Sequence, residues 1–131
     1  MVFKSVASIN GILSIAYGVA GLVVPAAIAS VYGLEITDRE RGILRLLGAS
    51  YLRFGMLCWV ARAVTDGAAR RAIALGALAG WGLGVPVALV GQLGGLVNAL
   101  GWSVVGLQIA FVLGWGWALR EAARSRSRVT A

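Results

Sequence analysis

The chain has 131 residues, of which 60% are hydrophobic and only 13% are charged, and its formal net charge is +7. A soluble domain carries about 25% charged residues, so this composition excludes a disordered chain and argues against a water-soluble domain. Four membrane spans of about 20 residues fit this length with short loops. We therefore predict an all-α, antiparallel four-helix transmembrane bundle in a single domain. In such a protein the basic excess sets the orientation in the membrane, so we expect no nucleic-acid partner.

The cysteine and histidine content limits the possible chemistry. Cys58 is the single cysteine, and the chain has no histidine. An internal disulfide and a cysteine-based metal cluster are therefore impossible within one chain. The commonest general base and metal ligand is also missing. We predict no catalytic residue, no metal site and no cofactor.

The first predicted span covers residues 5–24 and is ended by Pro25. Lys4 and the sequence Ala27-Ile28-Ala29 also resemble the basic region and cleavage site of a signal peptide. Signal peptides have an apolar region of about 7–15 residues, shorter than this run, so we favour an uncleaved span. Residues 26–34 either extend the helix past a kink or lie in the membrane interface.

The other spans follow from apolar runs and their flanking signals. Thr37 and Glu40 have the spacing of a capping box before the second span. Pro86 lies inside the third span and predicts a kink there. The predicted spans cover residues 42–61, 72–92 and 103–119; a turn covers 93–102, and a frayed basic tail covers 120–131.

Basic residues predict the orientation of the four spans. The side that holds both termini and the second loop carries eight of them, and the opposite side carries two, Arg39 and Arg41. The eight are Lys4, Arg62, Arg70, Arg71, Arg120, Arg124, Arg126 and Arg128. The positive-inside rule then predicts a multi-pass protein of the bacterial plasma (inner) membrane with both termini in the cytoplasm. We also expect the arginines of the tail to bind anionic lipid headgroups.

Glycines at helical spacing predict close helix packing. Gly76, Gly80 and Gly84 recur every four residues in the third span, a small-xxx-small pattern that lets two backbones approach. We favour packing inside the bundle. The alternative is an outward-facing stripe that builds a homo-oligomer. Similar stripes occur in the first two spans, at Gly11, Gly18 and Gly21 and at Gly48 and Gly55.

Arg53 is the residue most suggestive of a binding site. It lies near the middle of the second span, where a charge costs about 2.5–3.5 kcal/mol on insertion scales. Arg45 lies eight residues earlier and can reach the interface, whereas Arg53 is too deep. We therefore expect Arg53 to face the interior of the bundle.

No acidic residue lies within a predicted span to pair with Arg53. At similar depth we expect Ser14, Tyr17, Trp81 and Gln108, and we predict that Tyr17 and Trp81 point into the bundle to satisfy their polar hydrogens. In one interpretation these groups pair with Arg53 and the arginine is structural. In the other, Arg53, Arg45, Tyr17, Gln108 and Trp81 bind an anionic or carbonyl-bearing ligand.

Short motifs suggest a family. They are Asn10-Gly11, Tyr17-Gly18, Tyr32-Gly33-Leu34, residues 45–49 (RLLGA) and residues 98–102 (NALGW). Together they resemble small bacterial four-span membrane proteins of unknown function, similar in layout to the DoxX-like proteins. The resemblance implies a four-helix membrane bundle and assigns no catalytic residue.

Three classes of function are compatible with the sequence. We favour a non-enzymatic binding or accessory subunit, either as a homo-oligomer or in a larger membrane complex. An oligomeric transporter or channel for a small anionic or amphipathic solute comes second. A membrane enzyme that acts on lipid or quinone comes third, because histidine and a deep carboxylate are both missing.

Overall fold

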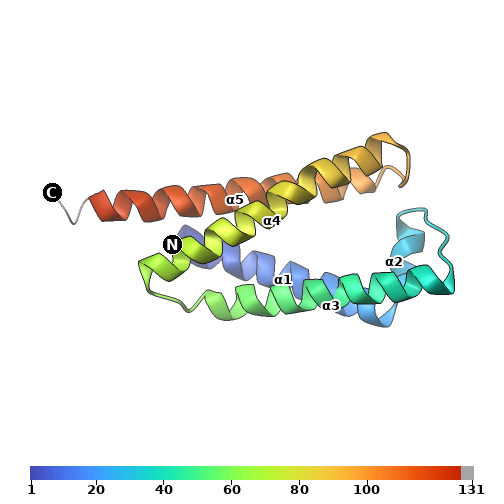
Figure 1. Ribbon diagram of the computed structural model, residues 1–131, viewed down its shortest axis with the longest axis horizontal. Helices are drawn as coiled ribbons and strands as arrows, with labels where there is room; N and C mark the ends of the chain where they lie inside the picture. Colours follow the sequence, from blue (N-terminus) through green and yellow to red (C-terminus); the bar gives the residue numbers. More distant parts are fainter. Residues whose placement is uncertain (128–131) are drawn as a thin grey trace.

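The computed structural model describes residues 1–127, with side chains described for residues 1–123. Its elements are α1 (Val2–Val23), α2 (Pro25–Val31), α3 (Asp38–Ala61), α4 (Gly67–Leu93) and α5 (Gly101–Ser127). Figure 1 shows the chain crossing the molecule in alternate directions, with both termini and the α3–α4 loop at one end. Four helices are long and apolar enough to cross a membrane, so the all-α fold of a membrane protein is confirmed.

Local capping residues determine where α3 and α4 begin. The predicted capping box is confirmed, because the backbone N–H of Thr37 donates to Glu40 Oε2 at 2.6 Å and the Thr37 hydroxyl accepts from the Glu40 N–H. The helix therefore starts at Asp38, four residues before the predicted start of the apolar span. Asp66 caps α4 in the same way, accepting from the Ala69 N–H at 2.8 Å.

The C-terminal tail differs from the prediction in its first part. Helix α5 continues to Ser127, so fraying from residue 120 onward is wrong. Arg, Glu and Ala are strong helix formers, which explains why the helix continues beyond the apolar run. The side chains of Arg124, Arg126 and Arg128, and the lipid contacts predicted for them, lie outside the described residues.

Helix α2 is a separate short element at the end of the molecule opposite the termini (Figure 1). Val24 has φ −130° and ψ 53°, which interrupts the helix, and Pro25 occupies the first turn of α2, where its missing N–H costs nothing. The loop at residues 94–100 lies beside α2, because Asn98 donates from its side chain to the Val31 carbonyl at 2.9 Å. We call this region the α2 end and the opposite region the termini end.

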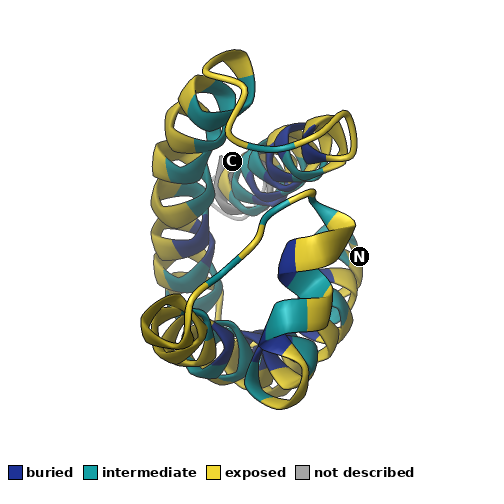
Figure 2. Ribbon diagram, turned by 90° about the vertical axis from the view of Figure 1, so that its right-hand side faces the viewer, coloured by how far each residue is buried: buried dark blue, intermediate teal, exposed yellow. Residues whose placement is uncertain are grey.

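The four long helices form two pairs. Helix α1 packs along α3, α4 packs along α5, and the pairs meet chiefly where α1 contacts α5. Over the part of the chain that the structure describes, the backbones of α3 and α4 stay apart, and the edge-to-face rings of Phe54 and Trp81 bridge the two helices with 6.2 Å between centroids. The inward faces carry the buried residues, as Figure 2 shows in a view toward the α2 end. The bundle is therefore open on one side, between α3 and α4.

Glycines bring α1 and α3 into backbone contact. A Cβ added at Gly18 would lie 2.5 Å from the Leu52 nitrogen, and one at Gly48 would lie 2.8 Å from the carbonyl carbon of Gly21. Gly11 and Gly55 meet the partner backbone in the same way. Any larger side chain would separate these helices, so the glycine stripes of the first two spans form the tight interface.

The glycine stripe of α4 does not have this role. A Cβ at Gly76 or Gly80 would meet nothing within 4 Å, so the prediction that this stripe packs inside the bundle is wrong for both residues. Only Gly84 faces a neighbour, the side chain of Gln108. The packing of distant helices decides this: Ala74 and Ala77 are the α4 residues buried in the core, whereas Gly80 and Gly84 line the cavity between α3 and α4.

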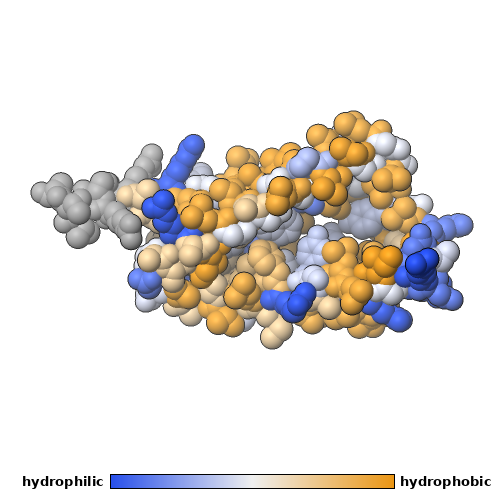
Figure 3. Space-filling view, in the orientation of Figure 1, coloured by the Kyte–Doolittle hydropathy of each residue, from blue (hydrophilic) through white to orange (hydrophobic). Residues whose placement is uncertain are grey.

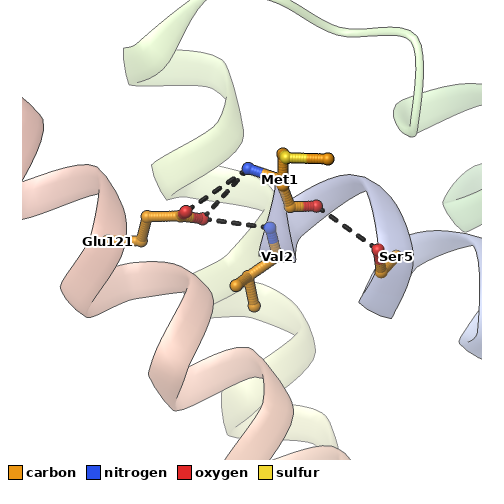
Figure 4. Close-up of polar contacts among 4 residues, drawn as sticks. All are labelled: Met1, Val2, Ser5 and Glu121. Atoms are coloured by element: carbon orange, nitrogen blue, oxygen red, sulfur yellow. Dashed lines mark hydrogen bonds and ion pairs between the residues drawn. The ribbon is translucent and has the colours of Figure 1, made fainter.

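The packed core lies in the termini end. It is built from small and aromatic side chains, among them Phe3, Ala7, Cys58 and Trp115. In Figure 4 the Glu121 carboxylate of α5 binds the start of α1, accepting from the Met1 amine at 3.3 Å and the Val2 N–H at 3.1 Å. This end of the bundle is thereby closed.

Candidate ligand-binding cavity

Two adjoining cavities occupy the half of the bundle toward α2. Their volumes are about 240 and 220 Å³, and Leu47, Tyr51, Trp81 and Gln108 line both of them. The first lies between α3 and α4, where Figure 3 shows paler side chains in a recess between two apolar surfaces. An apolar cavity of about 150 Å³ can hold benzene, so each of these is large enough for several carbon atoms.

A buried polar cluster adjoins the cavities, which two of its members, Ser14 and Trp81, line. Asn10 of α1 is fully buried, and its Oδ1 accepts from the indole N–H of Trp81 at 2.9 Å and of Trp115 at 2.9 Å. Its amide nitrogen donates to the Ser14 hydroxyl at 3.0 Å. One side chain of α1 thus binds both α4 and α5. The Trp81 ring also stacks on Phe111, with 4.7 Å between centroids.

Tyrosines lie on the side of the cavity nearest α2. The hydroxyls of Tyr17 and Tyr32 are 3.2 Å apart and share a hydrogen bond. The Tyr51 ring lies 6.4 Å from that of Tyr17. Burial, together with the hydrogen bond to Tyr17, raises the pKa of Tyr32 to about 12. The Tyr32 hydroxyl therefore remains neutral at physiological pH and can both donate and accept.

Gln108 is a cavity-lining polar residue whose hydrogen bonding is incomplete. It is only 8% exposed, it lines both cavities, and its Oε1 has no hydrogen-bond partner. A buried acceptor without a partner costs about 1–3 kcal/mol. Gly84 packs against this amide, since a Cβ at that position would lie 2.9 Å from Gln108 Oε1. Gln108 therefore holds a buried, unpaired acceptor in the wall of the cavities, beside Gly84.

The structure places the two arginines of α3 outside the cavity. Arg53 is exposed, and its guanidinium donates to the Ser50 hydroxyl at 3.2 Å, so the prediction that it faces the interior is wrong. At 3.6 residues per turn, Arg53 lies about 140–160° around the helix from Gly48 and Gly55, which face α1. Arg45 is also exposed, and neither arginine is among the cavity-lining residues.

The structure therefore divides the predicted site. Tyr17, Trp81 and Gln108 line one cavity, whereas Arg45 and Arg53 lie on the outer surface. Trp115 is fully buried. Sequence analysis missed Asn10, although an asparagine within an uncharged apolar run is a signal of a buried polar contact.

Comparison with known proteins supplies no relative. No family model matches the chain, and no curated protein or solved structure matches it. The resemblance to the DoxX-like proteins stays a prediction. Any function must therefore be argued from the cavity itself.

Proposed function

We propose that this chain is a non-enzymatic membrane protein that binds an amphipathic molecule in the cavities between α3 and α4. The observation that carries the proposal is Gln108, a buried amide that lines both cavities and has an unpaired Oε1. Ligand sites are typically apolar with a few polar groups that fix orientation, and these cavities have that composition. Among the described lining residues there is no Asp, Glu, Lys or Arg to act as an acid or base.

The open side of the bundle supports access from the bilayer. The gap lies between two spanning helices, α3 and α4, which also carry exposed leucines and valines such as Leu46, Leu83 and Val87. A molecule dissolved in the lipid could enter without crossing water. The cavities do not lead through the termini end, where the core is packed, so the geometry favours binding over transport.

We further propose that the termini end lies in the cytoplasm of a bacterial cell, at the inner membrane. The positive-inside rule supports this orientation, because Arg62, Arg70, Arg71 and Arg120 all belong to this end of the bundle. The cavity would then lie in the half of the membrane that faces away from the cytoplasm.

Two matched variants test the proposed binding. Gly80 lines the mouth of the cavity, whereas Gly76, one turn away on the same stripe, does not, and a Cβ at either position meets open space. Gly80→Phe should fill the mouth and weaken binding at least tenfold, while Gly76→Phe should bind as the unaltered chain does. Binding of a bromine-tagged long-chain amphiphile to detergent-solubilised protein is followed by quenching of tryptophan fluorescence. Trp81 lines both cavities, so reduced quenching in Trp81→Phe would assign the signal to the cavity.

The proposal is overturned if Gly80→Phe and Gly76→Phe bind the probe equally. Size-exclusion chromatography with light scattering is run on both variants, because a change of oligomeric state in only one of them would confound the comparison. Absence of saturable quenching in the unaltered chain would also refute the proposal.

A second candidate is an accessory subunit of a larger membrane complex. The observation that favours it is Arg53, an exposed cation midway along α3 whose hydrogen bond goes to the neutral hydroxyl of Ser50. Such a charge in a span is costly and is normally paired. An acidic residue of a partner subunit would supply the missing anion. Crosslinking through Arg53→Cys in native membranes, compared with Arg45→Cys near the helix end, tests this candidate; absence of any crosslinked protein counts against it.

A further inference from the structure

We infer that the molecule bound between α3 and α4 is a neutral lipid whose head is a hydroxyl group that donates a hydrogen bond to Gln108 Oε1. This inference rests on the proposed binding function and adds the chemistry of the head.

The lining of the cavity argues against a charged head. The polar lining residues of both cavities are neutral: Ser14, Tyr17, Tyr32, Ser50, Tyr51 and Gln108. Burying a carboxylate or an ammonium without a counter-ion costs several kcal/mol even after relaxation. The cationic residues of α3, Arg45 and Arg53, lie on the outer surface and line neither cavity. A head without charge avoids this cost.

The amide of Gln108 requires a donor. Its Oε1 lacks a hydrogen-bond partner although the residue is 8% exposed. The last torsion of a glutamine side chain is broad and roughly two-fold, so a half-turn exchanges the amide oxygen and nitrogen. The amide occupies the space beside Gly84, so no side chain at that position obstructs this turn. A ligand hydroxyl can therefore donate to the oxygen, which an ether or an alkane cannot do.

The tyrosines can donate a hydrogen bond to the oxygen of the ligand's hydroxyl group. Tyr17 and Tyr32 share one hydrogen bond between their two hydroxyls, so one hydroxyl hydrogen of the pair is free to donate elsewhere. A hydroxyl head both donates and accepts, and so fits a cavity that offers an unpaired amide oxygen and phenolic hydroxyls. The apolar chain of the ligand would occupy the part of the cavity lined by Leu47 and Phe54, toward the opening.

Three matched probes test the inference: a bromine-tagged long-chain alcohol, its methyl ether and the corresponding carboxylic acid. The alcohol and the ether differ in the hydrogen that Gln108 would accept. A hydrogen bond contributes a net of about 0.5–1.5 kcal/mol, which corresponds to roughly a 2- to 13-fold preference for the alcohol over the ether. The acid, measured above its pKa, should bind more weakly than the alcohol.

The variants Gln108→Leu and Gln92→Leu assign the preference to one residue. Both glutamines have a buried Oε1 without a hydrogen-bond partner, but Gln92 lies near the end of α4 and lines neither cavity. Gln108→Leu should abolish the preference for the alcohol over the ether, and Gln92→Leu should retain it.

The outcomes separate this inference from the proposed function. Equal binding of all three probes, or a preference that survives Gln108→Leu, would overturn the hydroxyl head and leave the binding function standing. Tighter binding of the acid would also overturn it and would point to a cationic contact. If no probe binds the unaltered chain, the proposed function fails with it. The comparison of alcohol and ether in the unaltered chain needs no variant, so it holds even if Gln108→Leu fails to fold.

Discussion

Replacement of Asn10 by alanine should weaken the association of the two helix pairs. Asn10 is fully buried, and its Oδ1 is the acceptor for the indole N–H groups of Trp81 and Trp115. The substitution leaves both donors without this partner. Because Trp81 belongs to α4 and Trp115 to α5, the effect falls on the contact of α1 with the α4–α5 pair rather than on its contact with α3.

The expected loss follows from the burial of the two indoles. Trp115 is fully buried, and an unpaired buried donor costs about 1–3 kcal/mol. Trp81 faces the cavity and can find another partner, so its contribution should be close to the average of about 0.6 kcal/mol for interhelical hydrogen bonds in a membrane protein. Together these give a loss of about 2–4 kcal/mol in the free energy of unfolding. Ser14→Ala leaves both indoles paired but leaves the buried amide N–H of Asn10 without the Ser14 acceptor, so it should cost about 1–3 kcal/mol, less than Asn10→Ala.

Unfolding with increasing mole fraction of sodium dodecyl sulfate in mixed micelles, followed by far-ultraviolet circular dichroism, measures both variants. A cycle that combines Asn10→Ala with Trp115→Phe isolates the coupling between these two residues. The reasoning is refuted if Asn10→Ala costs no more than Ser14→Ala, or if the cycle gives no coupling.

Three further predictions concern other parts of the chain. Gly18→Ala should destabilise the protein by about 1–3 kcal/mol, because the added Cβ overpacks against Leu52. Gly76→Ala adds a Cβ that meets open space, so it should stabilise α4 slightly through helix propensity. Equal effects of the two variants in detergent unfolding would contradict the glycine contact between α1 and α3. Thr37→Ala should remove the cap of α3 and cost about 0.5–2 kcal/mol, measured in the same assay, and no loss would argue against the capping box. The pKa of Tyr32 is raised from 10.0 to about 12 in the folded protein. The stability that this neutral hydroxyl contributes is therefore fully present below pH 10 and should be lost between pH 10 and 12. Tyr32→Phe should remove this part of the loss at alkaline pH, and an unchanged dependence of stability on pH would refute the assignment to Tyr32.

Two predictions that depend on neighbouring residues along the chain were correct. Two predictions that depend on how distant helices pack against one another were wrong. The capping box at Thr37 and the break at Pro25 depend on local backbone geometry, and both are present. The direction of Arg53 depends on which face of α3 packs on α1, and depth in a span carries no information about that face. The same limit explains why Gly76 and Gly18, alike in sequence pattern, differ in packing.

The candidate site was predictable in part for the same reason. Trp81 and Gln108 are polar groups deep in apolar runs, which must seek partners inside the protein, and both line the cavity. The opening between α3 and α4 could not be predicted, because no residue pattern specifies that two neighbouring helices stay apart.

The separation of the backbones of α3 and α4 has a kinetic consequence. If the α4–α5 pair swings away from the α1–α3 pair about the packed termini end, few van der Waals contacts on the open side must break. The activation barrier for exchange of a molecule with the surrounding lipid would then depend mainly on separation of the Phe54 and Trp81 rings and on distortion near Asn10. Residence time and affinity should accordingly respond to substitutions in different places.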